Sequence, residues 1–360
     1  MTELLESASH AAACGGTSVL LSFGEETVGG QILATGTPDS IVGSLGEGER
    51  AIVVLPFSPD EPALAHRVHL RPVSLPTPPD RERTHQVRQM PSGATYAIRV
   101  ADALERIDRG EIDKVVLGRG LRVTSPPAWE PEELLARLLE ARPGRYIFSV
   151  PTPDGTLLGA SPELLVRRLG THVASLPLAG SLPRAQEADQ DGARAARLLA
   201  SAKDLVEHRY VVDQIVDALA TVAEVTAVLK APALVATDTL WHLATEIEAV
   251  LPDHPELSAL DLARRLHPTP AMAGTPTAAA LQVIAEIEQS SRGPFTGAVG
   301  WVDAAGDGEF VLTIRAGLLR GETFDLFAGA GIVEGSVPGL EVAETGAKLA
   351  TMARIAGVSR

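Results

Sequence analysis

Short apolar runs separated by glycine-rich turns dominate the first seventy residues. Ser18–Phe23 and Ala51–Leu55 are two such runs. Their length and the turn residues around them predict strands of a sheet. The stretch from Arg71 to Gln86 is rich in proline and charge, which predicts an exposed connection.

Helical spacing alternates with further short runs beyond this connection. Apolar residues recur at helical intervals over Tyr96–Ile107, and Gly110 is a plausible stop signal. Further helices are expected over Pro131–Ala141, Leu257–Leu266, Ala278–Glu288 and a last segment to about Ala356. Strands are predicted at Val115–Leu117, Arg145–Val150, Leu157–Gly159, Leu164–Arg167, His172–Leu178, Leu240–Val250, Gly297–Val302, Phe310–Leu319 and Phe324–Phe327.

The longest helical pattern runs from about Ala193 to Val222. Asp204 and Glu207 lie at the border of its apolar stripe, which faces the core of an amphipathic helix. The residues expected in that stripe are Leu198, Ala202, Leu205, Val212, Ile215 and Leu219.

The grouping of the strands indicates the fold class. They come as hairpin-like neighbours rather than in strict βαβ alternation, which favours an α+β fold with large, mostly antiparallel sheets covered by helices. Residues 1–90 are interpreted as a divergent N-terminal part of the same fold, and residues 91–360 as the catalytic region. No Walker A or Rossmann glycine pattern occurs in a strand–helix context, so a nucleotide cofactor is not indicated.

Composition narrows the classes of function. The chain has 360 residues, 45% of them hydrophobic, and a net charge of −15, which argues against nucleic acid or an anionic membrane as a partner. The one cysteine, Cys14, excludes an internal disulfide framework. With no signal-peptide pattern and no apolar stretch near the roughly 18 residues that span a membrane, we expect a cytoplasmic protein, and by default a monomer.

Two widely separated acidic pairs are the strongest chemical signal. Asp204 and Glu207 are three residues apart in SAKDLVEHRYVV, as are Glu341 and Glu344 in LEVAETGAKLA, where Lys348 follows. Residues three or four apart share one face of a helix. Two such faces brought together would make an oxygen-rich site suited to Mg²⁺, whereas either pair alone is more often a solvated charged face.

An ordered series of motifs extends through the chain beyond residue 90. In order they are DKVVLGR, SPELLVRR, LPLAGSLPR, SAKDLVEHRYVVD, TLWHLAT, HPTPAMAG, TIRAG, FAGAGIV and EVAETGAKL. This series resembles the chorismate-utilising enzyme family, and within it the isochorismate synthase branch. The resemblance covers roughly residues 90–358 and implies large sheets packed face to face.

The resemblance also implies a reaction and the residues that perform it. In the reversible conversion of chorismate to isochorismate, water adds at ring carbon 2 while the carbon-4 hydroxyl leaves. Lys114 matches the family's general base, which must reach its neutral form to act. Glu163 matches the general acid, which must stay protonated near neutral pH. His242 matches a pocket histidine with a catalytic role, which could hydrogen-bond near the leaving hydroxyl, although a lone histidine in an apolar strand is more often a satisfied core residue.

The remaining site residues follow from the same resemblance. Glu207 and Glu344 match the ligands of a Mg²⁺ cofactor, with Asp204 and Glu341 as helpers. Arg315 and Lys348 would hold the substrate's pyruvyl carboxylate and nearby oxygens. The other expected substrate-contacting positions are Gly180, Ser181, Ala271 and Gly329.

Three positions distinguish this chain from other branches of the family. Ammonia-using relatives carry glutamine in place of Lys114, aminodeoxychorismate-forming relatives carry lysine in place of Ala179, and salicylate-forming relatives tend to carry threonine in place of Ala271. The resemblance therefore implies release of isochorismate, a precursor in menaquinone and siderophore biosynthesis. A salicylate synthase, which also expels pyruvate, and a non-catalytic chorismate-binding homologue are the alternatives.

Overall fold

The computed structural model describes residues 18–24, 26–74, 83–141, 145–229, 231–237, 240–251 and 256–358. Cys14 lies outside the described residues. So does the middle of the connection predicted from Arg71 to Gln86.

The first of two large sheets is antiparallel throughout. Its strands follow the order β6-β7-β21-β20-β9-β8-β1-β2-β5, and the short β17 pairs with the start of β7. These strands are β1 (Ser18–Phe23), β2 (Val28–Gly36), β5 (Arg71–Pro72), β6 (Gln86–Met90), β7 (Lys114–Thr124), β8 (Tyr146–Thr152), β9 (Gly155–Ser161), β17 (Gly274–Thr275), β20 (Ala316–Arg320) and β21 (Thr323–Val333).

The second large sheet begins on the same strand β2. The first half of β2 pairs with β1, and its second half pairs with β4. From there the antiparallel order is β2-β4-β3-β18-β19-β10-β11-β16-β13. The added strands are β3 (Arg50–Leu55), β4 (Leu64–Val68), β10 (Leu164–Leu169), β11 (His172–Leu176), β13 (Glu224–Val228), β16 (Ile247–Val250), β18 (Ala298–Asp303) and β19 (Gly308–Leu312).

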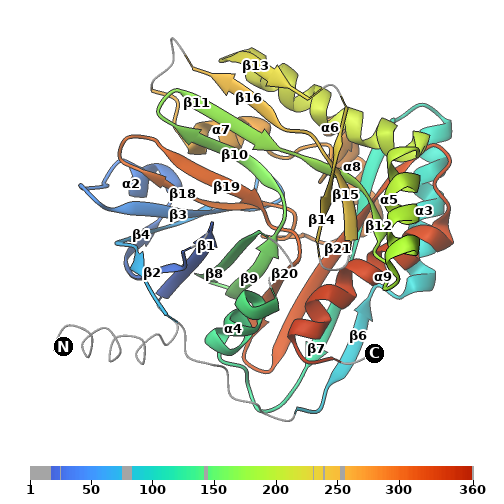
Figure 1. The fold of residues 1–360 in the computed structure, drawn as a ribbon. Helices are drawn as coiled ribbons and strands as arrows, with labels where there is room; N and C mark the ends of the chain where they lie inside the picture. The colour runs from blue at the N-terminus through green and yellow to red at the C-terminus, as the bar shows by residue number, and fades with distance from the viewer. Residues whose placement is uncertain are drawn as a thin grey trace.

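A small third sheet and the helices complete the fold. The small sheet has the order β12-β15-β14, with β12 (Leu178–Pro183), β14 (Ala233–Ala236) and β15 (Leu240–Ala244). In Figure 1, α3 and α9 lie side by side next to the long strands β7 and β21. The helices are α2 (Pro38–Val42), α3 (Gly93–Asp108), α4 (Pro131–Ala141), α5 (Ala188–Leu199), α6 (Ala202–Ala220), α7 (Ala259–Leu266), α8 (Thr277–Glu288) and α9 (Pro338–Ile355).

Side chains on opposite faces of a buried strand pack into different apolar clusters. Ile52 and Val54 of β3 pack with Val19 and Leu21 of β1 in one apolar cluster between the two large sheets. Leu20 points the other way, into a cluster with α4 and α9. This is the two-residue period of a strand buried on both faces. The α+β fold with antiparallel sheets packed face to face and covered by helices is confirmed.

The helix predicted from Ala193 to Val222 is in fact two helices. α5 ends at Leu199 and α6 begins at Ala202, because Ser201 caps α6 by accepting a hydrogen bond from the Asp204 backbone N–H. Such a cap needs an extended residue and so interrupts the helix. The predicted stripe was also partly wrong. Ala202 is exposed and Leu205 and Val212 are half-buried, whereas His208 and Val211 are buried.

Three predicted strands are each divided in two. Pro177 separates β11 from β12, and Thr245 and Glu246 separate β15 from β16, so each segment joins a different sheet. The third break, between β19 and β20, includes Arg315 at φ 48°. That left-handed conformation is uncommon for a residue other than glycine and cannot continue a strand. Within the described part of the chain, no helix is long and apolar enough to cross a membrane.

Candidate active site

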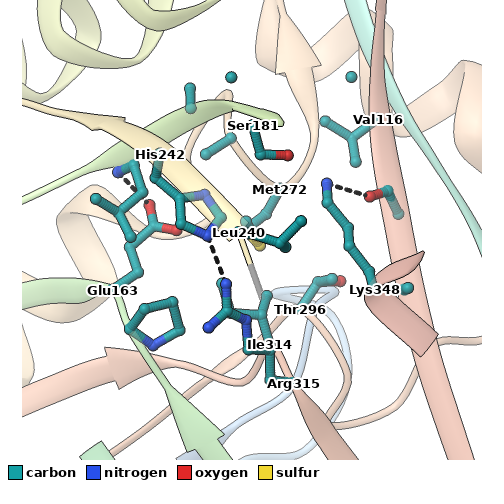
Figure 2. Close-up of a pocket in the computed structure, with 18 of the residues that line it drawn as sticks. Val116, Glu163, Ser181, Leu240, His242, Met272, Thr296, Ile314, Arg315 and Lys348 are labelled. Atoms are coloured by element: carbon teal, nitrogen blue, oxygen red, sulfur yellow. Dashed lines mark hydrogen bonds between the residues drawn. The ribbon is translucent and has the colours of Figure 1, made fainter. Parts of the chain in front are cut away.

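One cavity collects most of the side chains that the sequence singles out. It lies where α6, α9, β21 and the small sheet meet the ends of the two large sheets (Figure 2). Its lining includes the predicted residues Glu163, Gly180, Ser181, Glu207, His242, Ala271, Arg315, Gly329, Glu344 and Lys348. Lys114, Asp204 and Glu341 are not in the lining, although each is linked to this site as described below.

Glu163 is a buried carboxyl group at the turn between β9 and β10. It is 2% exposed, and its Oε1 accepts a hydrogen bond of 3.2 Å from the Leu178 backbone N–H. Burial raises the pKa of Glu163 to about 8, because the charged form loses its hydration, and the Leu178 bond and nearby cations only partly offset this. The side chain can therefore hold a proton at neutral pH.

His242 and Arg315 form a hydrogen-bonded pair beside Glu163 (Figure 2). Arg315 Nη2 donates to His242 Nε2 at 2.5 Å. A ring nitrogen that accepts a hydrogen bond carries no proton, so the imidazole is neutral in this arrangement. Burial, together with the charges of Arg315 and Lys348, holds the pKa of His242 well below its usual value. His242 is thus both a buried residue and a pocket residue.

Lys348 and Glu344 project into the cavity from α9. Lys348 Nζ lies 2.8 Å from Glu344 Oε1 and donates a 2.9 Å bond to the Gly329 carbonyl. Ser181 Oγ donates to the same Glu344 oxygen at 3.4 Å. Burial disfavours the charge on Lys348, but nearby carboxylates, above all Glu344, outweigh it and raise the pKa of Lys348. Lys348 therefore remains a cation.

Lys114 lies directly behind the cavity wall. It is fully buried at the start of β7, and its Nζ is 3.2 Å from Oε1 of Glu207, a lining residue. Gly331 makes this approach possible, since a Cβ there would lie 2.1 Å from Glu207 Oε1 and 3.1 Å from Lys114 Cε. β7 begins one residue before the predicted strand Val115–Leu117, so Lys114 is its first residue.

The two acidic segments come together, as the sequence predicts. Lys203 of α6 donates a 2.8 Å bond to Glu341 of α9 across 138 residues of chain. A Cβ on Gly180 would lie 3.0 Å from the Asp204 side chain, which places Asp204 behind that lining glycine. Burial, reinforced by neighbouring carboxylates, raises the pKa of both Asp204 and Glu341.

Carboxylates of α6 and α9 are the candidate ligands for Mg²⁺. Across the described ranges, no three carboxylate, histidine or cysteine side chains converge closely enough to ligate one ion. However, no hydrogen-bond partner for the buried Glu341 Oε2 is found among the described residues, and the burial and neighbouring carboxylates that raise the pKa of Asp204 and Glu341 favour an added cation. Mg²⁺ keeps several waters and is often bound through one or two carboxylates. On these grounds the donor set fits the ion.

Several residues of the site escaped the sequence reasoning. Gly331 and Thr313 lie in the motifs FAGAGIV and TIRAG, where only Gly329 and Arg315 had been selected. Lys203 lies inside SAKDLVEH, where only the acidic residues Asp204 and Glu207 are predicted to belong to the site. Phe327 begins the same FAGAGIV motif, whereas Thr296 lines the cavity but carries no periodic or charge signal that would identify it.

Comparison with known proteins agrees with this geometry. Residues 64–357 match the family described as chorismate binding enzyme, and the chain belongs to this family. It is similar to the isochorismate synthase DhbC of Bacillus subtilis, with 46% identity over 76% of this chain and 71% of that protein. It is also similar to the isochorismate synthase EntC of Escherichia coli K12, with 45% identity over 75% and 68%.

A solved structure extends the similarity to the whole fold. It is described as a putative 2,3-dihydroxybenzoate-specific isochorismate synthase, DhbC, from Bacillus anthracis. The two superpose with a TM-score of 0.89 and 34% identity, covering 98% of this chain and all of the other. The similarity therefore includes the strands before residue 64.

Proposed function

We propose that this protein is an isochorismate synthase that converts chorismate to isochorismate, adding water at carbon 2 and releasing the carbon-4 hydroxyl. The family and the named relatives support the substrate class. The observation that carries the proposal is Glu163, a carboxyl group with a pKa near 8 in a cavity that also contains Arg315 and Lys348.

Glu163 acts as the general acid in this proposal. A carboxyl group that remains protonated at neutral pH can give its proton to the departing carbon-4 oxygen. Neutral His242 cannot replace it as the acid, but its bond to Arg315 fixes the direction of the guanidinium group. His242 then serves the reaction by holding Arg315 in place.

Lys114 acts as the general base. From its position behind Glu207 and Gly331, it would accept a proton from the water that adds to carbon 2. A basic group and an acidic group on different walls suit a reaction in which water enters and hydroxide leaves. The charge of Lys114 acts to lower the pKa of Glu163, against the larger effect of burial. The two groups are therefore electrostatically coupled.

The substrate carboxylates meet the cations of the cavity. Arg315 and Lys348 would bind the pyruvyl carboxylate and adjacent oxygens through charge-assisted hydrogen bonds. Gly180 and Gly329 would offer close backbone approach, since glycine has no Cβ to hold the ligand away, and Ser181 would contact the substrate beside Gly180. Ala271 supplies no hydroxyl to orient the pyruvyl group for elimination.

We further propose that Glu207 and Glu344 hold Mg²⁺, with Asp204 and Glu341 assisting. When bound, the ion supplies positive charge that neutralises and orients the ring carboxylate. In the structure, Glu207 is paired with Lys114 and Glu344 with Lys348.

Purified protein incubated with chorismate and Mg²⁺ tests the proposal. We expect isochorismate to accumulate without added lyase and without pyruvate. Prompt, stoichiometric pyruvate would instead establish the salicylate synthase alternative. Binding of chorismate with no turnover would establish a non-catalytic homologue.

Glu207→Gln and Glu344→Gln are each expected to lower Mg²⁺-dependent turnover by about 100-fold or more and to weaken Mg²⁺ binding measured by calorimetry. Each change removes one anionic oxygen donor from a hard cation. Glu248→Gln, on the exposed face of β16, is the matched control and should change neither quantity. Unaltered Mg²⁺ affinity in both site variants would contradict the metal assignment.

A further inference from the structure

A buried ion pair outside the predicted site stands directly behind one wall of the cavity. Glu288 ends α8 and Arg292 follows it, and each is only 5% exposed. Arg292 Nη2 lies 2.6 Å from Glu288 Oε1, and Arg292 Nε lies 2.9 Å from Glu288 Oε2. The two-pronged geometry is the strong form of this pair, and nothing in the proposed mechanism uses it.

The remaining hydrogen bonds of the Arg292 guanidinium group go to the lining of the cavity. Arg292 donates to the carbonyls of Val116 at 2.7 Å and Met272 at 3.0 Å, and to Thr296 Oγ1 at 3.3 Å. All three recipients line the cavity (Figure 2). A single guanidinium group thus ties together three segments that are remote from one another in the chain.

Two further contacts extend the same wall. The Arg292 guanidinium lies 5.4 Å from the centre of the Phe327 ring, another lining residue. Glu288 Oε1 accepts a 2.7 Å bond from the Gly118 N–H, and a Cβ on Gly118 would collide with that same ring. The pair therefore fixes both the backbone of β7 and the aromatic side chain packed on it.

The backbone of Thr296, which belongs to this wall, has an energetically unfavourable conformation. Its φ is 59°, a left-handed value that is a genuine outlier for a β-branched residue. Such strain persists only where surrounding contacts impose it, and it clusters at functional sites. Here the contacts are the bond from Arg292 and a 3.0 Å bond from the Thr296 N–H to the Thr313 carbonyl.

We propose that Glu288 and Arg292 are positioning residues that set the shape of the wall formed by Val116, Met272, Thr296 and Phe327, against which the substrate ring is bound. The pair touches no substrate and transfers no proton. Its effect is on the binding and alignment of the ring, and the inference rests on the proposed function for the identity of that ring.

Arg292→Lys keeps the charge but loses the planar fork, so it should raise the KM for chorismate and lower kcat/KM by tenfold or more while the protein stays folded. Misalignment of this kind is costly because catalysis depends on the position of the reacting atoms. Glu286→Gln is the matched control. Glu286 lies on α8, as Glu288 does, and its substitution breaks an exposed ion pair with Arg106 of α3, which should leave both constants unchanged.

A double variant separates positioning from simple stabilisation. Replacing a buried ion pair by neutral groups of similar size is often neutral for stability, so Glu288→Gln with Arg292→Met should stay folded. If the pair positions the wall, this variant keeps the unfolding midpoint of the wild type while its kcat/KM stays at least tenfold reduced. Recovery of wild-type kcat/KM along with stability would overturn the proposal, as would an unchanged KM in Arg292→Lys.

Binding measurements keep this test independent of turnover. In a Glu163→Gln background, calorimetry gives the Kd for chorismate with and without Arg292→Lys, and we expect it to rise by tenfold or more. If the wild type binds chorismate but forms no isochorismate, the proposed function fails and this comparison still tests the pair. An equal Kd for Glu163→Gln with and without Arg292→Lys would refute the positioning role and leave the proposed function untouched.

Discussion

Glu163→Gln is expected to lower kcat for chorismate conversion by about 10²–10⁴-fold, the usual contribution of a positioned acid. The amide has nearly the same shape and can still accept the Leu178 N–H bond, but it has no proton to give. Product formation measured by chromatography under saturating chorismate checks the result. Glu248→Gln on β16 controls for the loss of an unrelated carboxylate.

The pH profile supplies a second signature of the same residue. Burial raises the pKa of Glu163 to about 8, so the proton-donating form dominates below pH 8 and is lost above it. We therefore expect kcat/KM to fall on the alkaline side with an apparent pKa near 8. The residual activity of Glu163→Gln should lack that alkaline limb. An unchanged limb in the variant would assign the titration to another group.

Glu163→Gln should change stability in the opposite direction to activity. Because the pKa is raised in the folded protein, the stability associated with protonated Glu163 is complete below about pH 4.5 and is lost as pH rises through 8. Glu163→Gln removes this dependence. At pH 9 the variant should unfold at higher denaturant than the wild type, by a free energy on the order of a few kcal/mol.

Lys114→Gln is expected to lower isochorismate formation by about 10²–10⁴-fold, because an amide cannot take the proton from the incoming water. The change also leaves Glu207 without the ammonium group that lies 3.2 Å from it. The rate under saturating Mg²⁺ and chorismate is the measurement.

Arg209→Gln provides a control for the loss of positive charge, because Arg209 is exposed on α6 two residues after Glu207. Its turnover should equal that of the wild type. Turnover near the wild-type level in Lys114→Gln would show that water is activated by some other group, even if Glu163 is the acid.

The fold could be predicted wherever the pattern is local. Pro131–Ala141 forms a helix over the expected residues and Ser18–Phe23 forms the expected strand, since periodicity and turn residues define both. The errors fall where tertiary structure interrupts an apolar run. Ser201 caps α6 in the middle of a helical pattern, and Arg315 takes a left-handed conformation between two strands. Neither the cap nor the left-handed residue alters the spacing of apolar residues from which the elements are predicted.

The sequence predicts those site residues that belong to a family motif or to a cluster of charged residues. The sequence placed Glu163, His242 and Lys348 in one pocket, and the structure brings them together. It could not indicate Arg292 or Glu288, because an arginine four residues after a glutamate is usually a surface pair and burial is a property of the folded chain. The spacing of four residues does indicate the pair of Lys348 with Glu344, but nothing local indicates that Lys114 and Lys203 each face a carboxylate.

The contribution of α9 has a consequence for how activity arises during biosynthesis. This helix fills an apolar cluster with Leu349 and Met352 while it delivers Glu344 and Lys348 to the cavity. Its partners on α6 leave the ribosome well over a hundred residues earlier. Every strand of both large sheets precedes α9 in the chain, so a nascent chain lacks Glu344 and Lys348 until α9 has been synthesised and packed.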